Sequence, residues 1–296
     1  MLNMTGLHKP KVSVLMPVYN TKEEHLRGAI DSILHQTFTD FEFLILNDAS
    51  TDSNVERVIK SYSDDRIVYT VNDKNMGISD TRNRLVEMAN GEYLAIVDHD
   101  DISMPDRFME QVAWLDGHPE TGIVGAMIES VYDSGEKKII EYPEKNNDIK
   151  KKMLWKNCMM HPVCMIRKLV LEEHGVNYES LFSPAEDYAL FCRLLDKTEF
   201  HNLQKILLYY RNHSNNTSHL QSQEMSDAAM IIQDFARHEN PELWGFSRLN
   251  LFRKIRFCLF KKLPVIKIEE RYNRFDFYLF SCIPIFSITR EEWREK

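Results

Sequence analysis

The sequence has few of the features that mark a disulfide-stabilised or membrane-spanning protein. Its 296 residues include five cysteines, which are odd in number and widely spaced, and no Cys-x-x-Cys pair occurs. A disulfide framework or structural zinc site is therefore not expected, and reduced cysteines are typical of a cytoplasmic protein. The longest uncharged apolar run near the C-terminus, residues 277–289, has 13 residues and contains a proline, so it is too short to cross a bilayer. Residues 1–20 show no pattern of a signal peptide.

The charge of the chain is unevenly distributed. Overall, 37 basic and 45 acidic residues give a net charge of −8, which argues against a general nucleic-acid-binding protein. Residues 243–296, however, hold 12 basic and six acidic residues. The rest of the chain is strongly acidic, and we expect the two parts to have different tasks. A hydrophobic content of 43% and a charged content of 28% exclude a disordered chain.

The first hundred residues alternate between strand and helix signals. Apolar, β-rich runs are separated by stretches such as residues 23–36 and 78–90, in which apolar residues recur at helical spacing. The β-rich runs cover residues 12–18, 41–46, 66–71 and 93–97. Strands that are apolar throughout are typical of a parallel sheet covered by helices on both faces. The predicted fold class is therefore α/β.

Polar residues follow each predicted strand at the point where it ends. Tyr19 follows the first strand, Asp48 the second, Gly77 the third, and Asp98–Asp101 the fourth. Because ligands of such sheets bind beyond the carboxyl ends of the strands, we expect these residues to share one site.

Asp98–His99–Asp100–Asp101 is the most informative of these segments. Three carboxylates within four residues repel one another, and a divalent cation such as Mg²⁺ or Mn²⁺ would remove that repulsion. Phosphate oxygens of a ligand would complete the coordination. The alternative is an acidic loop in which an aspartate caps the helix that begins at Pro105.

Other candidate residues allow both a structural and a functional interpretation. Asp48 could accept hydrogen bonds from a base or ribose, or cap the helix that begins near Asp52. Arg82 could pair with a phosphate, or be a solvated surface residue. Asp187 could cap the helix that it opens, or act as a general base. His213 lies in a polar loop and could bind metal or phosphate, or be a surface histidine.

Several motifs, in the right order, resemble those of the family 2 glycosyltransferases. They span roughly residues 11–218, about two thirds of the chain. They are Lys11–Asn20 (KVSVLMPVYN), Ser32–Phe43 (SILHQTFTDFEF), Asn47–Asp52 (NDASTD), Asn75–Asn83 (NMGISDTRN), Gly91–Asp101 (GEYLAIVDHDD), Met104–Arg107 (MPDR) and Glu186–Asp187.

This resemblance implies a GT-A fold, a Rossmann-like, mostly parallel central sheet flanked by helices. On this basis we expect an N-terminal extension (1–10), a nucleotide-sugar-binding half (11–101), an acceptor-binding half that carries the catalytic base (102–220), and a helical basic C-terminal extension (221–296). The implied reaction is an inverting transfer of a sugar from a nucleotide sugar, most simply a UDP-sugar, to a hydroxyl of a glycan or lipid-linked acceptor. Such enzymes take part in bacterial surface polysaccharide synthesis.

The resemblance also assigns roles to individual residues. Pro17, Tyr19 and Asp48 are expected to border the nucleobase, and Arg82 to lie near the base or diphosphate. Asp98 and Asp100 would line the ribose and phosphates. A divalent metal, Mn²⁺ or Mg²⁺, would be bound directly by Asp101, with Asp100 and His213 in the same metal site. Asp187 matches the general base.

Some positions depart from the family pattern. Ala49 stands where glycine is commoner, and Asn47 replaces a frequent aspartate. The QxxRW motif of processive members is missing after Asp187, which favours the transfer of one or a few sugars over polymerisation.

The basic segment at residues 243–296 suggests a further contact. Between Trp244 and Lys267 there are seven Lys and Arg residues and no acidic residue, interleaved with aromatic and aliphatic ones. This composition suits peripheral contact with an anionic membrane at the cytoplasmic face. The alternative is a helix that packs on the catalytic domain with its lysines in water. The oligomeric state is not indicated.

Two other functions would use the same features. A phosphohydrolase could place an aspartyl-phosphate at Asp98–His99–Asp100, but it would need a downstream Lys and acidic pair, and the PVYN motif argues against it. A non-catalytic nucleotide- or glycan-binding module could keep the fold, although Asp101 and Asp187 would then have no evident use.

Overall fold

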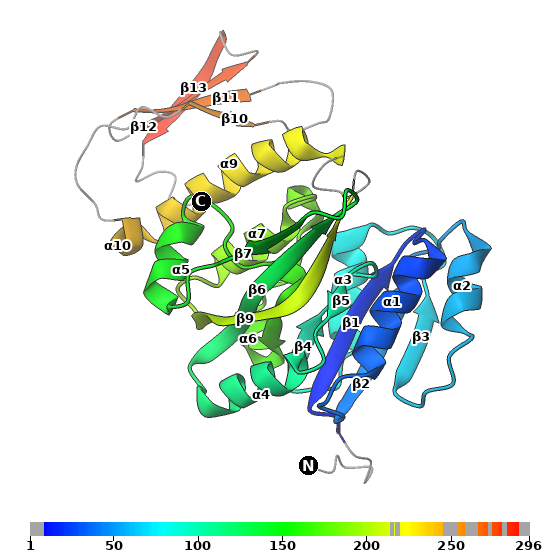
Figure 1. Cartoon of the computed structure of the whole chain (residues 1–296). Coiled ribbons are helices and arrows are strands. Elements are labelled where there is room, and N and C mark those ends of the chain that lie inside the picture. The colour runs from blue at the N-terminus through cyan, green and yellow to red at the C-terminus, as the bar shows by residue number, and fades with distance from the viewer. Residues whose placement is uncertain are drawn as a thin grey trace. The chain divides into compact units, whose positions relative to one another are not determined.

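The computed structural model describes residues 9–213, 216 and 220–244 and four later strand segments, 254–257, 266–271, 274–279 and 283–289. The chain divides into two compact units, Met1–Leu243 and Trp244–Lys296. The first unit is a mixed α/β body in which helices cover the faces of one large sheet (Figure 1). Among the described residues, no helix has the length and apolar content needed to cross a bilayer.

The first unit contains a nine-stranded sheet with the order β3-β2-β1-β4-β8-β6-β9-β5, and β7 pairs with β6. The strands are β1 (Val12–Val18), β2 (Phe41–Asn47), β3 (Ile67–Val71), β4 (Tyr93–Ile96), β5 (Ile102–Ser103), β6 (Thr121–Tyr132), β7 (Lys137–Ile140), β8 (Met165–Arg167) and β9 (Glu199–Asn212). The helices are α1 (Glu23–Leu34), α2 (Ser53–Ile59), α3 (Ile78–Met88), α4 (Arg107–Gly117), α5 (Asn146–Met153), α6 (Lys168–His174), α7 (Glu186–Arg193), α9 (Ser222–Glu239) and α10 (Pro241–Trp244), with 3-10 turns η1 (His161–Val163) and η2 (Ser180–Phe182).

The predicted arrangement of the first four strands is confirmed. β1 pairs in parallel with β2 and β4, and β2 pairs in parallel with β3. β4 then pairs with β8 in the antiparallel sense, so the sheet continues into its second half with mixed strand directions. The carboxyl ends of β1 to β4 consequently lie along one edge.

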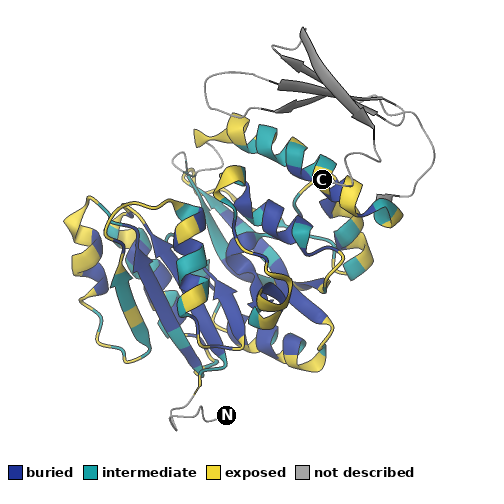
Figure 2. Cartoon of the chain, turned by 180° about the vertical axis from the view of Figure 1, so that it is seen from behind, coloured by how far each residue is buried: buried dark blue, intermediate teal, exposed yellow. Residues whose placement is uncertain are grey.

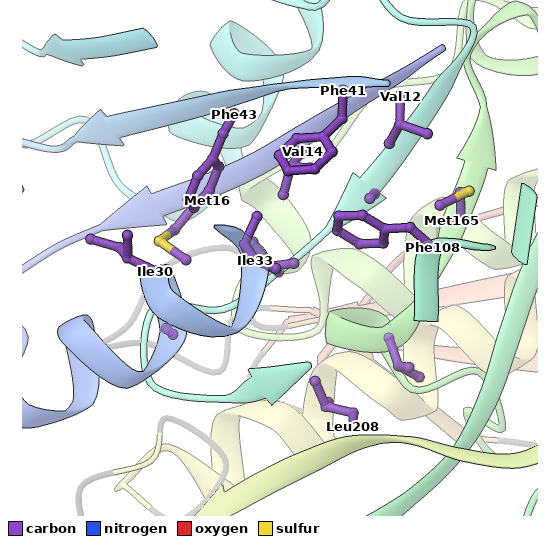
Figure 3. Packing of buried hydrophobic residues seen from close by; sticks show 14 of the residues in the cluster. Val12, Val14, Met16, Ile30, Ile33, Phe41, Phe43, Phe108, Met165 and Leu208 are labelled. Carbon is purple, nitrogen blue, oxygen red and sulfur yellow. The ribbon is translucent and has the colours of Figure 1, made fainter. Parts of the chain in front are cut away.

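Both faces of the central strands are buried, as the uninterrupted apolar runs predict. All seven residues of β1 are buried. One face of the sheet packs on α1, where Ile30 and Ile33 lie close to Met16 and Phe43 (Figure 3). α3 also contacts β1 and β2. Figure 2 shows the central strands of this sheet as buried, with exposed residues on the outer sides of the helices, whereas β3 and β7 include exposed residues.

The predicted helical character of residues 221–296 is only partly correct. α9 and α10 are helical, but the second unit contains a four-stranded sheet of order β10-β11-β12-β13, all neighbours antiparallel. Its strands are β10 (Lys254–Phe257), β11 (Ile266–Arg271), β12 (Arg274–Leu279) and β13 (Ile283–Thr289). In β10, β11 and the first half of β12, aromatic and β-branched residues alternate with charged ones, a period of two that favours strands over helices. Two residues separate β11 from β12, which is a hairpin spacing.

Gly91 sets the position of β4 beside β1. Its backbone N–H donates to the Ser13 hydroxyl over 2.8 Å, and a Cβ at this position would lie 2.5 Å from the Ser13 backbone nitrogen. We predict that Gly91→Ala lowers the free energy of unfolding by about 1–3 kcal/mol, because backbone atoms cannot yield to the added methyl group. Urea unfolding followed by circular dichroism measures this loss.

Gly117→Ala is the matched control, because a Cβ at Gly117, at the end of α4, meets nothing within 4 Å. Its unfolding midpoint should not fall. Equal midpoints for the two variants would contradict the close approach of Gly91 to β1.

Candidate active site

The loops that follow β1 and β2 are joined by Asn20. The Asn20 side-chain oxygen accepts hydrogen bonds from the backbone N–H groups of Thr51 (2.9 Å) and Asp52 (3.2 Å). The Asn20 backbone N–H donates to the Ser50 hydroxyl (3.0 Å). Asn20 and Ala49 both have positive φ angles, 48° and 54°. Ala49 therefore adopts a conformation that glycine adopts without strain, which gives a physical reason for the glycine that is commoner at this position.

Asp48 orders the segment that leads into α3. Its carboxylate accepts hydrogen bonds from the Asn72 side chain (2.6 Å) and from the backbone N–H groups of Met76 and Gly77 (both 2.9 Å). The capping alternative for Asp48 is wrong, since Asp52 itself caps α2 by accepting from the Asn54 N–H. Asp48 thus ties the end of β2 to the loop that follows β3.

The other two residues expected at the nucleobase differ in exposure. Pro17 is buried within β1, opposite Leu46 of β2. Tyr19 follows the end of β1 and is 44% exposed. Of the two side chains, that of Tyr19 is open to a ligand.

The acidic loop after β4 is attached to the end of β9. Asp101 is 4% exposed, and its Oδ1 accepts a hydrogen bond from the Arg211 backbone N–H over 2.8 Å. The Arg211 guanidinium donates to the Asp100 backbone carbonyl over 2.9 Å. The carboxylate of Asp100 faces His213, with 3.1 Å between Oδ2 and Nε2. This contact brings together two of the residues predicted for the metal site.

The capping alternative for this loop is not supported. The N-cap position of α4 is Asp106, whose side chain makes no capping hydrogen bond. Instead, burial raises the pKa of Asp101 well above its usual range, and the neighbouring carboxylates of Asp100 and Asp98 raise it further. Burial likewise raises the pKa of Asp98, against the opposing charge of Arg82. A loop with these properties favours a bound cation.

The residues present fit a divalent metal. Asp100 and His213 supply oxygen and nitrogen atoms that face one another, and Asp101 Oδ2 is buried without a hydrogen-bond partner among the described residues. Within the described part of the chain, no cluster of three or more His, Cys, Asp or Glu residues is arranged around a common metal position. A metal bound here would need oxygen atoms of the substrate phosphates to complete its coordination.

Arg82 connects the acidic loop to the start of α7. It is 9% exposed, so the alternative of a solvated surface residue is wrong. Its guanidinium donates to Glu186 Oε1 (2.5 Å) and to Asp98 Oδ1 (3.4 Å), and lies over the Tyr178 ring at 5.6 Å from its centroid. A single buried cation thus bridges carboxylates that are 88 positions apart in the sequence.

Asp187 lies in the first turn of α7, next to Glu186. Its Oδ1 accepts from the Tyr188 backbone N–H (2.7 Å), and its Oδ2 accepts from the Asn157 side-chain amide (3.2 Å). Burial and the charge of Glu186 together raise the pKa of Asp187 to about 7, against the opposing charge of Arg82. A carboxylate with this pKa can both hold and release a proton near neutral pH.

Five residues that the sequence did not mark as site residues complete the arrangement. They are His25, Asn157, Tyr178, Glu186 and Arg211. The His25 ring stacks on His213 with 5.7 Å between centroids, and the Tyr178 hydroxyl is 2.8 Å from Nε2 of the buried His161. Glu186 had a visible signal as the neighbour of Asp187. The other four act through contacts between distant segments, for which a single sequence carries no pattern.

Comparison with known proteins places this chain in a family. Residues 13–175, more than half of the chain, match the family model described as glycosyl transferase family 2. The O-antigen biosynthesis glycosyltransferase WbnJ of Escherichia coli is 31% identical over 214 residues, which are 70% of this chain and 81% of WbnJ.

Two solved structures share the fold. A structure of Staphylococcus aureus TarS residues 1–349 in complex with UDP-GlcNAc superposes with a TM-score of 0.62 at 21% identity, and the match covers 75% of this chain and 65% of that one. A mannosyltransferase of Pyrobaculum calidifontis, in complex with GDP-Man and Mn²⁺, superposes with a TM-score of 0.57 at 17% identity, covering 79% and 65%. At these identities the likeness concerns the fold alone, and it agrees with the expected GT-A architecture. With more than half of its length matched by the family model, the chain belongs to glycosyltransferase family 2.

Proposed function

We propose that this glycosyltransferase moves a sugar from a UDP-sugar to a hydroxyl of a glycan or lipid-linked acceptor, with inversion at the anomeric carbon. The observation that carries the proposal is the position of Asp187, whose raised pKa of about 7 suits a base, beside the Arg82 link to the acidic loop. A carboxylate that takes the proton from an attacking hydroxyl allows a single displacement without an enzyme nucleophile. The phosphohydrolase alternative receives no support from the family assignment.

The donor would occupy the edge formed by the carboxyl ends of β1 to β4. Pro17, Tyr19 and Asp48 are proposed to border the nucleobase, and Asp98 and Asp100 the ribose and phosphates. Asp48 would act here by holding Met76 and Gly77 in place. In this scheme residues 11–101 form the donor-binding half and residues 102–220 the acceptor-binding half.

A divalent metal, Mn²⁺ or Mg²⁺, would be bound directly by Asp101, with Asp100 and His213 in the same site, and would stabilise the charge of the leaving diphosphate. Support comes from the Mn²⁺ in the mannosyltransferase complex and from the raised pKa of Asp101. Arg82 contributes a fixed positive charge between Asp98 and Glu186. Asp187 accepts the proton from the acceptor hydroxyl at a carboxylate oxygen.

The acceptor is proposed to belong to bacterial surface polysaccharide synthesis. This rests on the relative WbnJ, whose name places it in O-antigen biosynthesis. The basic segment at residues 243–296 would bring the protein to the anionic cytoplasmic face of the membrane, where lipid-linked acceptors lie.

Asp187→Asn is the direct test of the base. We expect UDP release in the presence of acceptor to fall at least about a hundredfold, because the amide cannot take a proton. Donor affinity, measured by calorimetry, should stay largely unchanged. Asp196→Asn is the control, since Asp196 is an exposed partner of Lys197 beyond the end of α7 and should keep full activity. Normal turnover in Asp187→Asn would exclude Asp187 as the base.

The metal site is tested by donor binding with and without Mn²⁺. Asp101→Ala, Asp100→Ala and His213→Ala should each weaken Mn²⁺-dependent binding of a UDP-sugar on the order of tenfold to a hundredfold. Asp101→Asn keeps an oxygen for the Arg211 N–H but loses the negative charge, so it separates the electrostatic from the structural effect. Unchanged donor affinity in all four variants, measured by calorimetry with Mn²⁺, would refute this metal site.

Membrane contact predicts co-sedimentation of the full chain with vesicles that contain anionic lipid, weakening as salt rises. A variant with the segment's arginines and lysines between residues 248 and 267 changed to glutamine should stay in the supernatant. Neutral vesicles serve as the control. Failure of the full chain to sediment with anionic vesicles would reject the contact.

A further inference from the structure

Asp187 receives one hydrogen bond from a side chain on another segment. Asn157 follows α5, 30 positions before Asp187, and its Nδ2 lies 3.2 Å from Asp187 Oδ2. The other oxygen of Asp187 is held by its own helix, through the Tyr188 N–H. The carboxylate is therefore fixed from two sides, and among the described residues only Asn157 donates a hydrogen bond to it from outside α7.

The orientation of the Asn157 amide is set by a second contact. Its Oδ1 accepts a hydrogen bond from the Met159 backbone N–H over 3.0 Å. If the amide were flipped, the Met159 N–H would lose its acceptor and Oδ1 would face a carboxylate oxygen. The local turn at residues 157–159 therefore presents the N–H₂ group to Asp187, and an N–H donor favours the charged form of a carboxylate.

We propose that Asn157 is a positioning residue that orients the Asp187 carboxylate and favours its ionised form. This inference rests on the proposed role of Asp187 as the base. Without the amide, Oδ2 would be free to rotate away from the acceptor hydroxyl. The proton affinity of Asp187 would then be determined by burial and by its charged neighbours alone.

Those neighbours act in both directions on Asp187. Glu186 on the same helix and Asp98 on the acidic loop favour the protonated form, as does burial. Arg82 on α3 opposes them. Burial raises the pKa values of Tyr178, Cys164 and Cys192, the charge of Asp187 raises them further, and all three groups stay neutral near pH 7. Asn157 and Arg82 therefore both favour the ionised form of Asp187.

Two substitutions separate the hydrogen bond that Asn157 donates to Asp187 from the turn at residues 157–159. Asn157→Asp keeps an oxygen for the Met159 N–H but places a negative charge against Asp187. Asn157→Ala removes both contacts. Titration of the full chain labelled with ¹³C in the aspartate carboxyl groups follows Asp187 directly, and its signal is identified by its loss in Asp187→Asn. We expect the pKa of Asp187 to rise by roughly one unit in Asn157→Ala, and by more in Asn157→Asp.

Asn90→Ala is the matched control. Asn90 also donates from Nδ2 to a carboxylate, that of Glu42 over 3.1 Å, but Glu42 lies at the start of β2, away from the carboxyl ends of the strands. The titration of Asp187 in Asn90→Ala should be that of the unmodified protein. An unchanged pKa of Asp187 in both Asn157 variants would overturn the inference.

The rate of UDP release from UDP-GlcNAc, with water as acceptor, gives the second readout. The base must be ionised, so the rate should fall as the pH drops through the pKa of Asp187, and this fall should begin at higher pH in Asn157→Ala. A merely structural residue would lower the rate at every pH without moving either the rate profile or the carboxyl titration, and that combined result would overturn the inference. If the carboxyl titration shifts but the rate profile does not follow, Asn157 still positions Asp187, whereas the proposed role of Asp187 as base fails.

Discussion

The placement of several carboxylates at one edge of the sheet is the constraint on which the rest of the site depends. Asp101 and Glu186 are buried and Asp98 and Asp187 are partly buried, and an ionised carboxylate removed from water costs free energy unless a charge or a hydrogen-bond donor faces it. Arg82 lies between two of these carboxylates and supplies the opposing charge, through ion pairs to Asp98 and Glu186. The pair with Glu186 links α3 to α7.

The environments of these carboxylates differ in a way that separates their tasks. Asp101 combines burial with two acidic neighbours, and its pKa rises well above the usual range unless a cation is present. Asp187 has donors on both oxygens and Arg82 nearby, and its pKa stays at about 7. Groups whose surroundings push their proton affinities apart take different parts in acid–base chemistry. The acidic loop is suited to binding a metal and a diphosphate, whereas Asp187 is suited to binding and releasing a proton near neutral pH.

Local sequence patterns predicted those parts of the fold and site that depend on neighbours in the chain. The apolar runs of β1 to β4 and the polar residues after them are visible without any partner, and so is the Asp98–Asp101 segment. The surface alternative for Arg82 failed because its partner Glu186 lies 104 positions away. Asn157 and Arg211 could not be found for the same reason. The helical prediction for residues 221–296 is wrong at strands β10 to β13 for a different reason, because it rested on basic and aromatic composition and not on the period of two.

The acidic loop can hold its shape without a ligand because it is anchored at both ends. Beneath it, the fully buried Arg107 donates to the Ile96 carbonyl at the end of β4 (2.7 Å) and to the Ser103 hydroxyl (3.0 Å). Burial lowers the pKa of Arg107 to about 10, so it stays charged at neutral pH. At the other side, Arg211 fixes Asp100 and Asp101 through its side chain and its backbone. A loop fixed at residues 96, 100, 101 and 103 presents its carboxylates in one geometry before any donor arrives, so binding need not also order the loop, which lowers the entropic cost of binding.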